Sequence, residues 1–497
     1  MTHRDGFEKA FGQERVARRC PGIASRGRRR PNAFSKPPPA RSLWVIIHAP
    51  WYKSATVLRN NGWVCFSGVL LMRKAKIPLV FLLLIVVSGC ASIAKGVTQA
   101  ILERSEEEDT RACHIEGPPS EGLEALMREQ ENERAVGNTT RVLKVLMVHG
   151  IGKHLPGYSA RLTEHLMREL KLDLREEKYK EIVLREPEIW DDPLGRLRIS
   201  RYMNKARTRE LLFYELTWSE IIEQERKILE FDDSAEYTFR RTALNAELKK
   251  FFNSHVPDSL IFLGEAHVPI LSSVRQSFCW MTEGDWDEYA TFTDASCNLQ
   301  SGSRLQQIKE DDYAIVTHSL GSRIAIDTLR FFGEWAQTQE TEEFIELRNV
   351  LPNKEIPIYM LANQLPLLEL GRKRATVRGQ IAKYCRPDGE LRDQRILRKL
   401  PIYAFSDPND LLSYPIPPNF ADQYLDSRLC PKVTNIAINV AKPISLFGLG
   451  EFANPASAHG DYDHDERVIA LIAHGFGQEN AADIVKERCT WLETTED

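Results

Sequence analysis

The chain has 497 residues, of which 42% are hydrophobic and 27% are charged. These fractions are ordinary for a globular protein and exclude wholesale disorder, collagen and a polytopic membrane protein. Residues 1–89 hold 16 of the 66 Lys and Arg residues but only 3 of the 70 Asp and Glu residues, so residues 90–497 carry an excess of 17 acidic side chains. An acidic body repels phosphate backbones, and we therefore expect no nucleic-acid partner.

A short apolar run near the N-terminus has the features of a secretory signal. Residues 72–76 are basic, residues 77–87 are apolar, and Ser88 and Gly89 precede Cys90. This run is too short to cross a bilayer, which needs about 20 apolar residues. A charged segment, a short apolar run and a small-residue cleavage site are typical of a signal peptide. The alternative is a buried helix that ends in a free thiol.

Residues 87–90 resemble the lipobox of bacterial lipoprotein signals. The resemblance implies a signal peptide over 72–89 and a lipid on Cys90, which anchors the chain to a membrane without spanning it. Ala91, and no aspartate, follows the cysteine, which in that family favours the outer membrane with the body on the periplasmic face. Residues 1–71 have no place before such a signal. We interpret them as a non-native upstream extension or a disordered basic arm.

The remaining chain divides by its hydrophobic patterning. Residues 90–140 are charged and lack apolar periodicity, which predicts a flexible tether, and we expect an ordered domain over 141–480 and a tail over 481–497. Six cysteines fall beyond Cys90. An even number permits disulfides in an oxidising compartment, with 15 possible pairings, and free buried thiols are the equal alternative. These cysteines are Cys113, Cys279, Cys297, Cys385, Cys430 and Cys489.

Short apolar runs alternate with helical patterns along this domain. The runs predict strands at 142–148, 211–218, 313–317, 356–362, 401–405 and 433–440. Helical periodicity is found at about 159–170, between about 219 and 281, after the third of these strands and at about 464–474. This alternation predicts an α/β protein whose mostly parallel sheet has helices on both faces.

The predicted strand at 313–317 runs almost directly into Ser319, and an amphipathic helix begins immediately afterwards. Strand, sharp turn and helix form the nucleophile elbow, which lifts a serine hydroxyl above the sheet. The helix N-terminus behind the serine favours developing negative charge. Thr317 replaces the first glycine of the G-x-S-x-G motif, while His318 and Gly321 fit its other positions. The alternative is an ordinary serine N-cap.

Three further stretches supply candidate partners for this serine. His149, Gly150, Ile151 and Gly152 directly follow the first predicted strand. Asp410 follows the strand at 401–405, with Asp407 as the second candidate, and either can instead be a turn residue.

His459 lies in a predicted small-residue loop before the last helix. His464 and His474 fall within that helix and are expected to pack or face solvent. The acidic residues near 461–466 suit a helix N-terminus better than a metal site, so we expect no metal and no cofactor.

The order along the chain is a His-Gly turn, then Ser319, Asp410 and His459. This order resembles that of the lipase- and esterase-like α/β-hydrolases. The resemblance implies an α/β-hydrolase fold, a catalytic triad of these three residues, and an oxyanion hole formed by the N–H groups of Ile151 and Leu320.

The long separation between Gly152 and Ser319 predicts a helical insertion at about 171–300, which is either a cap over the site or a structural decoration. We expect a serine hydrolase acting on acyl esters or lipids at the cell envelope. The alternatives are an amidase or peptidase with the same triad and a non-catalytic lipoprotein scaffold.

Overall fold

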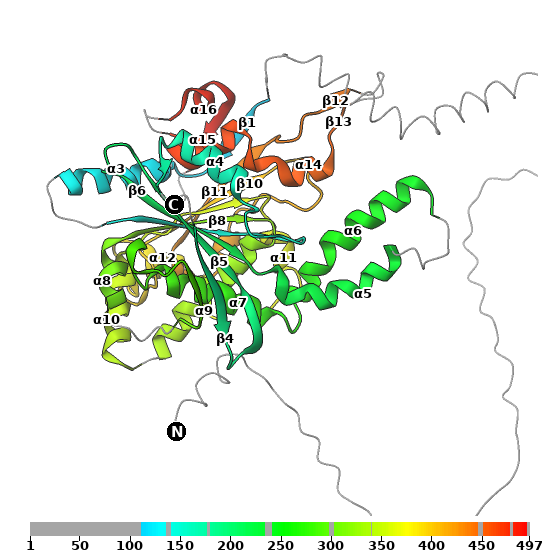
Figure 1. Cartoon of the computed structure of the whole chain (residues 1–497). Helices are drawn as coiled ribbons and strands as arrows, with labels where there is room; N and C mark the ends of the chain where they lie inside the picture. Colours follow the sequence, from blue (N-terminus) through cyan, green and yellow to red (C-terminus); the bar gives the residue numbers. More distant parts are fainter. Residues whose placement is uncertain are drawn as a thin grey trace, which may run out of the picture. The chain divides into compact units, whose positions relative to one another are not determined.

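The computed structural model describes residues 111–494, apart from 136–140, 176–178, 234–240, 298–302, 339, 446–450 and 478–480 (Figure 1). The predicted extension at 1–71, the signal at 72–89 and Cys90 lie outside the described residues. No helix within the described part of the chain is long and apolar enough to cross a membrane.

Twelve strands form one sheet, and six neighbouring strands at its centre are all parallel. In spatial order these are β11 (Pro431–Ile438), β10 (Leu400–Ser406), β9 (Ile358–Leu361), β8 (Asp312–His318), β2 (Leu143–Val148) and β6 (Glu210–Thr217). All six predicted strands are therefore present, and the mostly parallel α/β architecture is confirmed.

The two edges of the sheet contain the strands that the sequence did not predict. At one edge, β1 (Cys113–Glu116) runs antiparallel to β11 and pairs in parallel with β14 (Cys489–Leu492). At the other edge, the strands beyond β6 are, in spatial order, β5 (Trp190–Met203), β4 (Lys180–Glu186) and β7 (Phe292–Ala295). The short β3 (Asp173–Leu174) also pairs with β5, while β12 (Ile444–Ser445) and β13 (Glu451–Phe452) form a separate pair.

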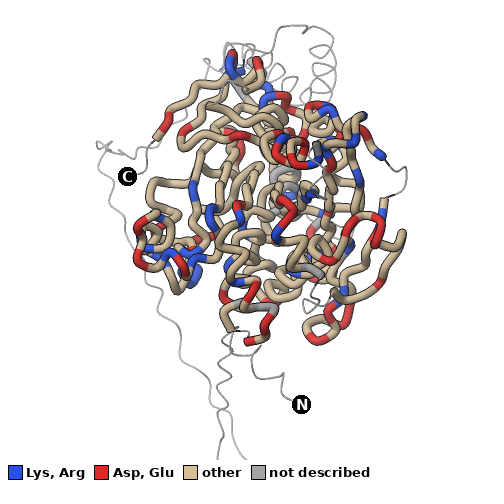
Figure 2. The backbone as a smooth tube through the Cα atoms, turned by 90° about the vertical axis from the view of Figure 1, so that its left-hand side faces the viewer, with Lys and Arg blue, Asp and Glu red and all other residues tan. Residues whose placement is uncertain are grey.

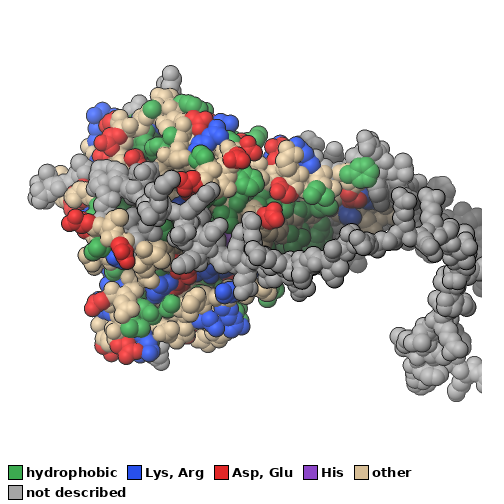
Figure 3. All heavy atoms as spheres, turned by 90° about the horizontal axis from the view of Figure 1, so that it is seen from below, with side chains coloured by type: hydrophobic (Ala, Val, Ile, Leu, Met, Phe, Trp, Pro, Cys, Tyr) green, Lys and Arg blue, Asp and Glu red, His purple; other side chains and the backbone are tan. Residues whose placement is uncertain are grey.

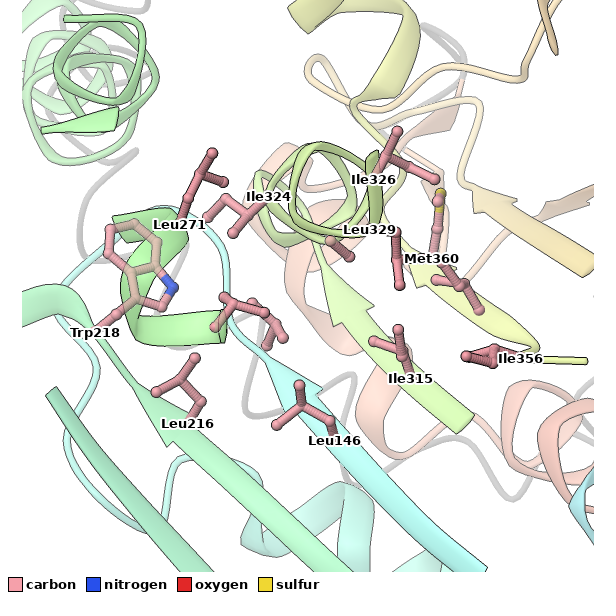
Figure 4. Packing of buried hydrophobic residues seen from close by; sticks show 14 of the residues in the cluster. Leu146, Leu216, Trp218, Leu271, Ile315, Ile324, Ile326, Leu329, Ile356 and Met360 are labelled. Carbon is pink, nitrogen blue, oxygen red and sulfur yellow. The ribbon is translucent and has the colours of Figure 1, made fainter. Parts of the chain in front are cut away.

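Helices cover both faces of the sheet, with one hydrophobic core on each face. One core contains side chains of α3 (Gly122–Ala135), α4 (Ala160–Glu169), α15 (Glu466–His474) and α16 (Asp483–Arg488). The other contains side chains of α7 (His267–Met281), α9 (Gly321–Thr338), α11 (Leu365–Glu369) and α13 (Phe420–Tyr424). In the second core, Leu146 and Ile315 of the sheet pack beneath Ile324 and Leu329 of α9 (Figure 4).

The remaining helices lie around this layered body. Two of them, α5 (Glu223–Asp233) and α6 (Ala243–Phe262), form an antiparallel pair that extends from the sheet (Figure 1). We call this pair of helices the α5–α6 hairpin. The others are α8 (Ser303–Glu310), α10 (Glu342–Val350), α12 (Ile381–Cys385) and α14 (Pro455–Gly460).

Three predicted boundaries are wrong. The expected tether at 90–140 contains β1 and α3, because Ile115 on the strand and Leu123 and Met127 on the helix are fully buried. The expected tail at 481–497 contains α16 and β14. The insertion expected at 171–300 is helical mainly from Glu223 to Met281, because β3 to β6 belong to the sheet.

All six cysteines beyond Cys90 are paired, which resolves the alternatives left open by the sequence. The disulfides join Cys113 to Cys489, Cys279 to Cys297, and Cys385 to Cys430. The first of these joins β1 to β14 and so links the two ends of the described chain.

Positions of Lys and Arg alternate with positions of Asp and Glu along the backbone of the described residues (Figure 2). Many of these residues form ion pairs, such as Arg141 with Asp312 and Arg467 with Asp465. The aspartate of the second pair also caps α15, since its side chain accepts the Arg467 N–H. The acidic residues near this helix thus include a true N-cap.

Candidate active site

Ser319 lies in the turn between β8 and α9 and has a left-handed backbone, with φ of 57°. Its N–H donates to the carbonyl of Leu361 on β9 at 2.8 Å. Its own carbonyl accepts bonds from the N–H and the hydroxyl of Ser322. These contacts hold a conformation that is unfavourable for a residue other than glycine. The turn predicted from the sequence is therefore present.

Two glycines allow the end of β2 to approach this turn. A Cβ on Gly321 would lie 2.4 Å from the carbonyl oxygen of Val148. A Cβ on Gly150 would lie 2.5 Å from the Cβ of Ser319 and 2.9 Å from the backbone nitrogen of Leu320. Because no larger residue fits at either place, the turn after β2 lies directly against the serine turn.

His459 joins Ser319 to Asp410. Its Nε2 lies 3.0 Å from the Ser319 hydroxyl oxygen, and its Nδ1 lies 2.8 Å from Asp410 Oδ2. All three side chains are buried. A carboxylate only accepts hydrogen bonds, so Nδ1 carries the proton towards Asp410 and Nε2 is left to accept the hydroxyl proton of Ser319. His459 lies in the short helix α14 rather than in the predicted loop.

Asp410 is held as an anion. Burial raises the pKa of its carboxyl group, but the hydrogen bond and charge of His459 and the N–H of Leu412 outweigh burial and hold the pKa below its usual value. The Leu412 N–H donates to Asp410 Oδ1 at 2.9 Å. Asp410 is therefore negatively charged at neutral pH and can stabilise a positive charge on His459.

Asp407, the second candidate for the acid, has other partners. Its Oδ2 accepts the N–H groups of Val440 and Ala441 beyond the end of β11, and its Oδ1 accepts the N–H of Asn409. Its own N–H donates to the hydroxyl of Tyr462 at 2.7 Å. Asp407 thus fixes the loop after β10, while Asp410 is the carboxylate that contacts the imidazole.

The N–H groups of Ile151 and Leu320 flank the serine turn. Among the hydrogen bonds of the described residues, none uses either of these two donors. Leu320 directly follows Ser319, and Gly150, which directly precedes Ile151, packs against Ser319 and the Leu320 nitrogen. Both donors are consequently free to bind an oxygen that develops negative charge beside Ser319.

His149 shapes the turn that carries Ile151. It stacks on Trp218, accepts the Trp218 N–H at Nε2, and contacts the carbonyl of Gly150 through Nδ1. Burial holds the pKa of His149 well below its usual value, so the ring is neutral and Nδ1 donates to Gly150. Because a peptide unit is planar and trans, fixing the Gly150 carbonyl also fixes the direction of the Ile151 N–H.

His318, the residue before the serine, supports His459 rather than the reacting oxygen. Its Nε2 donates to the His459 carbonyl at 2.8 Å. Burial, with a further contribution from the nearby His459, lowers the pKa of His318 to about 3. His318 is therefore neutral at physiological pH.

Thr317, at the usual glycine position of the motif, is fully buried. Its hydroxyl has no hydrogen-bond partner among the described residues. The site accommodates threonine here, but its hydroxyl makes no interaction that explains the choice.

Among the described residues, one group of side chains has the spacing of a metal site, namely Cys279, Glu283 and Cys297. The two cysteines are joined in a disulfide and therefore offer no thiolate to a metal.

Several residues that hold the site were not predicted from the sequence. The indole N–H of Trp218 binds the His149 carbonyl, and the Ser322 hydroxyl binds the Ser319 carbonyl. Arg226 and Asp258 contact Gly152. Each lies in an ordinary helical or strand-end context, so only the fold reveals its position.

Comparison with protein families, with curated proteins and with solved structures finds no match to this chain.

Proposed function

We propose that this protein is a serine hydrolase of the α/β-hydrolase type that cleaves acyl esters. The observation that carries the proposal is the unbroken hydrogen-bond chain from Asp410 through His459 to Ser319. The oxyanion turn, nucleophile, acid and base follow one another along the chain in the order typical of that fold. The oxyanion turn and the nucleophile directly follow β2 and β8, which are neighbours, and the acid lies in the loop after β10, which is separated from β8 by β9.

The proposed reaction has two halves. His459 takes the hydroxyl proton of Ser319 as its oxygen attacks the acyl carbonyl, and the N–H groups of Ile151 and Leu320 bind the resulting oxyanion. The oxyanion collapses, the carbon–oxygen bond to the alcohol breaks, and His459 gives its proton to the departing alcohol. Water then attacks the acyl-enzyme by the same steps and releases the carboxylic acid.

Exposed apolar side chains on the α5–α6 hairpin support a lipid as the acyl substrate. Ile228 on α5 is 73% exposed, and Leu260 on α6 is 65% exposed. Hydrophobic side chains are visible at the surface on the right of Figure 3, the side on which the hairpin lies in Figure 1. An exposed apolar surface of this kind is a feature of proteins that contact lipid.

Reaction with a fluorophosphonate probe tests the proposal. The protein over residues 91–497 and its Ser319→Ala variant are treated with the probe, with and without detergent, and the adduct is located by mass spectrometry. We expect labelling at Ser319 and none in the variant, followed by hydrolysis of a series of esters of different chain length. A folded wild-type protein that does not react under either condition would contradict the proposal and favour a non-catalytic scaffold.

We also propose that Cys90 carries the lipid anchor and places the protein at the outer membrane, facing the periplasm. The support is the lipobox-like sequence ending at Cys90. Expression in a bacterial host with an alkyne-bearing fatty acid, beside the Cys90→Ser variant, tests it. Incorporation that depends on Cys90 is expected, whereas a native N-terminus upstream of Met72 would contradict it.

A further inference from the structure

The turn after β2 is also held by the α5–α6 hairpin, through one ion pair. Arg226 on α5 donates to Asp258 on α6 from Nε and from one terminal guanidinium nitrogen, and each of these bonds reaches a different carboxylate oxygen. Asp258 Oδ2 accepts the N–H of Gly152 at 2.6 Å, and an Arg226 terminal nitrogen donates to the Gly152 carbonyl at 2.6 Å. The ion pair therefore binds both the N–H and the carbonyl of Gly152.

That glycine directly follows Ile151, one of the two proposed oxyanion donors. Gly152 has φ of 100°, which only glycine adopts readily. The carbonyl of Ile151 accepts a bond from His154 Nε2 at 3.0 Å, and the carbonyl of Gly150 is held by His149. The peptide planes on both sides of Ile151 therefore have fixed orientations. His149 fixes the plane before Ile151, and Asp258, together with His154, fixes the plane after it.

The two charges are far from the turn in sequence, at 74 and 106 residues from Gly152. Asp258 is 1% exposed, so its carboxylate is desolvated. A buried ion pair is a poor source of stability, because desolvation offsets the attraction between the charges. We therefore look for the role of this ion pair in geometry, since the two side chains set the position of the turn after β2 relative to α5 and α6.

We propose that Arg226 and Asp258 are positioning residues, which hold the turn so that the Ile151 N–H points at the developing oxyanion. The α5–α6 hairpin then controls the reactivity of Ser319 without contributing an atom to the reaction. This inference rests on the proposed function, because it assigns the two residues to the oxyanion hole of that site.

Loss of the contacts of Arg226 and Asp258 with Gly152 should lower kcat and leave KM little changed, because the oxyanion exists in the transition state and not in the bound ester. Removal of a whole oxyanion donor costs about 100- to 1000-fold in kcat. A donor that is present but misdirected should cost less, about 10- to 100-fold. Asp258→Asn keeps one oxygen for the Gly152 N–H, so its loss should be smaller than that of Asp258→Ala.

The experiment measures kcat and KM for a 4-nitrophenyl acyl ester and for its thionoester, in which sulfur replaces the carbonyl oxygen. Sulfur accepts hydrogen bonds weakly, so the preference for the oxygen ester reports the oxyanion hole itself. We expect this preference to fall in Asp258→Ala and to be partly restored in Asp258→Asn, while thermal unfolding midpoints show that both variants are folded. Arg226→Gln provides the same comparison if Asp258→Ala does not fold.

The matched control is Asp232→Ala, which breaks the other polar cluster of the hairpin. Asp232 on α5 binds Arg241 and accepts a bond from Asn253 on α6 at 2.9 Å. Equal losses of kcat in Asp232→Ala and Asp258→Ala, or an unchanged ester preference in folded Asp258→Ala, would overturn the inference while leaving the proposed function intact. A wild type that neither labels nor hydrolyses esters would overturn both.

Discussion

The left-handed backbone of Ser319 costs a residue other than glycine about 1–2 kcal/mol. The surrounding contacts maintain it, since its N–H is bound by Leu361 and its carbonyl by Ser322. This conformation directs the side chain away from the strand and towards His459. The local strain is therefore part of how the hydroxyl comes to lie 3.0 Å from the imidazole.

Substitution of the two neighbouring aspartates should separate the acid of the triad from its support. Asp410→Asn should lower kcat by about 10⁴-fold, because the amide NH2 can donate to Nδ1 and favour the wrong imidazole tautomer, and the neutral amide does not stabilise the charged imidazole. Asp407→Asn should chiefly lower the free energy of unfolding, because Asp407 accepts the N–H groups of Val440 and Ala441. Ester kinetics and urea unfolding measure the two effects, and a larger kcat loss in Asp407→Asn would reverse the assignment.

The elements found from the sequence are those with a uniform environment. Most of the central strands are buried on both faces and are largely apolar, such as 143–148, where Lys144 is the one charged residue, and the elbow motif lies between such a strand and an amphipathic helix. Ser319 and the turn at His149 were predicted for the same reason, since they directly follow two of these strands. Asp410 could not be separated from Asp407, because three residues of loop decide which carboxylate reaches His459.

Two of the missed elements, β1 and α3, bury few side chains. Strand β1 has four residues, of which Cys113 and Ile115 alternate towards the core, and α3 is mostly polar, with Leu123 and Met127 as its fully buried apolar side chains. Such patterns resemble those of solvated segments, and only the neighbouring elements make them favourable. The contacts of Arg226 and Asp258 with Gly152 could likewise not be predicted from the sequence, because they depend on where α5 and α6 pack.

Helices α3, α4 and α15 are joined by His474, which bonds to Glu124 through Nδ1 and to Glu169 through Nε2, each at 2.8 Å. Burial raises the pKa of Glu124, but the bonds and charges of His474 and Arg209 outweigh burial, so that its pKa lies below the usual 4.5. A lowered carboxyl pKa contributes stability above the unfolded value, and that stability is lost as the pH falls through the folded value.

Glu124→Gln should therefore reduce the loss of stability on acidification below pH about 4.5, by less than about 1 kcal/mol because the side chain is partly solvated. Urea unfolding between pH 3 and pH 7 measures the effect. Glu164→Gln, which breaks the exposed pair with Arg168, is the control. A wild-type slope in Glu124→Gln would contradict this role for the His474 bridge.

For the molecule as a whole, the cross-links differ in how much chain they enclose. Cys113 and Cys489 are separated by 376 residues, whereas Cys385 and Cys430 are separated by 45. Either disulfide should contribute about 2–5 kcal/mol to the free energy of unfolding. Loop-closure entropy makes the longer one the larger by about 2 kcal/mol.

Paired serine substitutions at each disulfide, compared by urea unfolding, measure this difference. We expect the Cys113→Ser/Cys489→Ser protein to be the less stable of the two. An equal or smaller loss at the longer cross-link would show that the two edge strands stay associated in the unfolded chain.

The pairing of β1 with β11 and β14 also determines how late during synthesis β1 can reach its final pairing. Strand β1, the first of the described strands, must wait for partners that are made more than 300 residues later, which takes about 15–75 s at about 5–20 residues per second. During that interval β1 has neither β11 nor β14 to pair with. A chain built in this order reaches its final structure only after its last residues have emerged, so a nascent chain released early would keep its first strand unpaired.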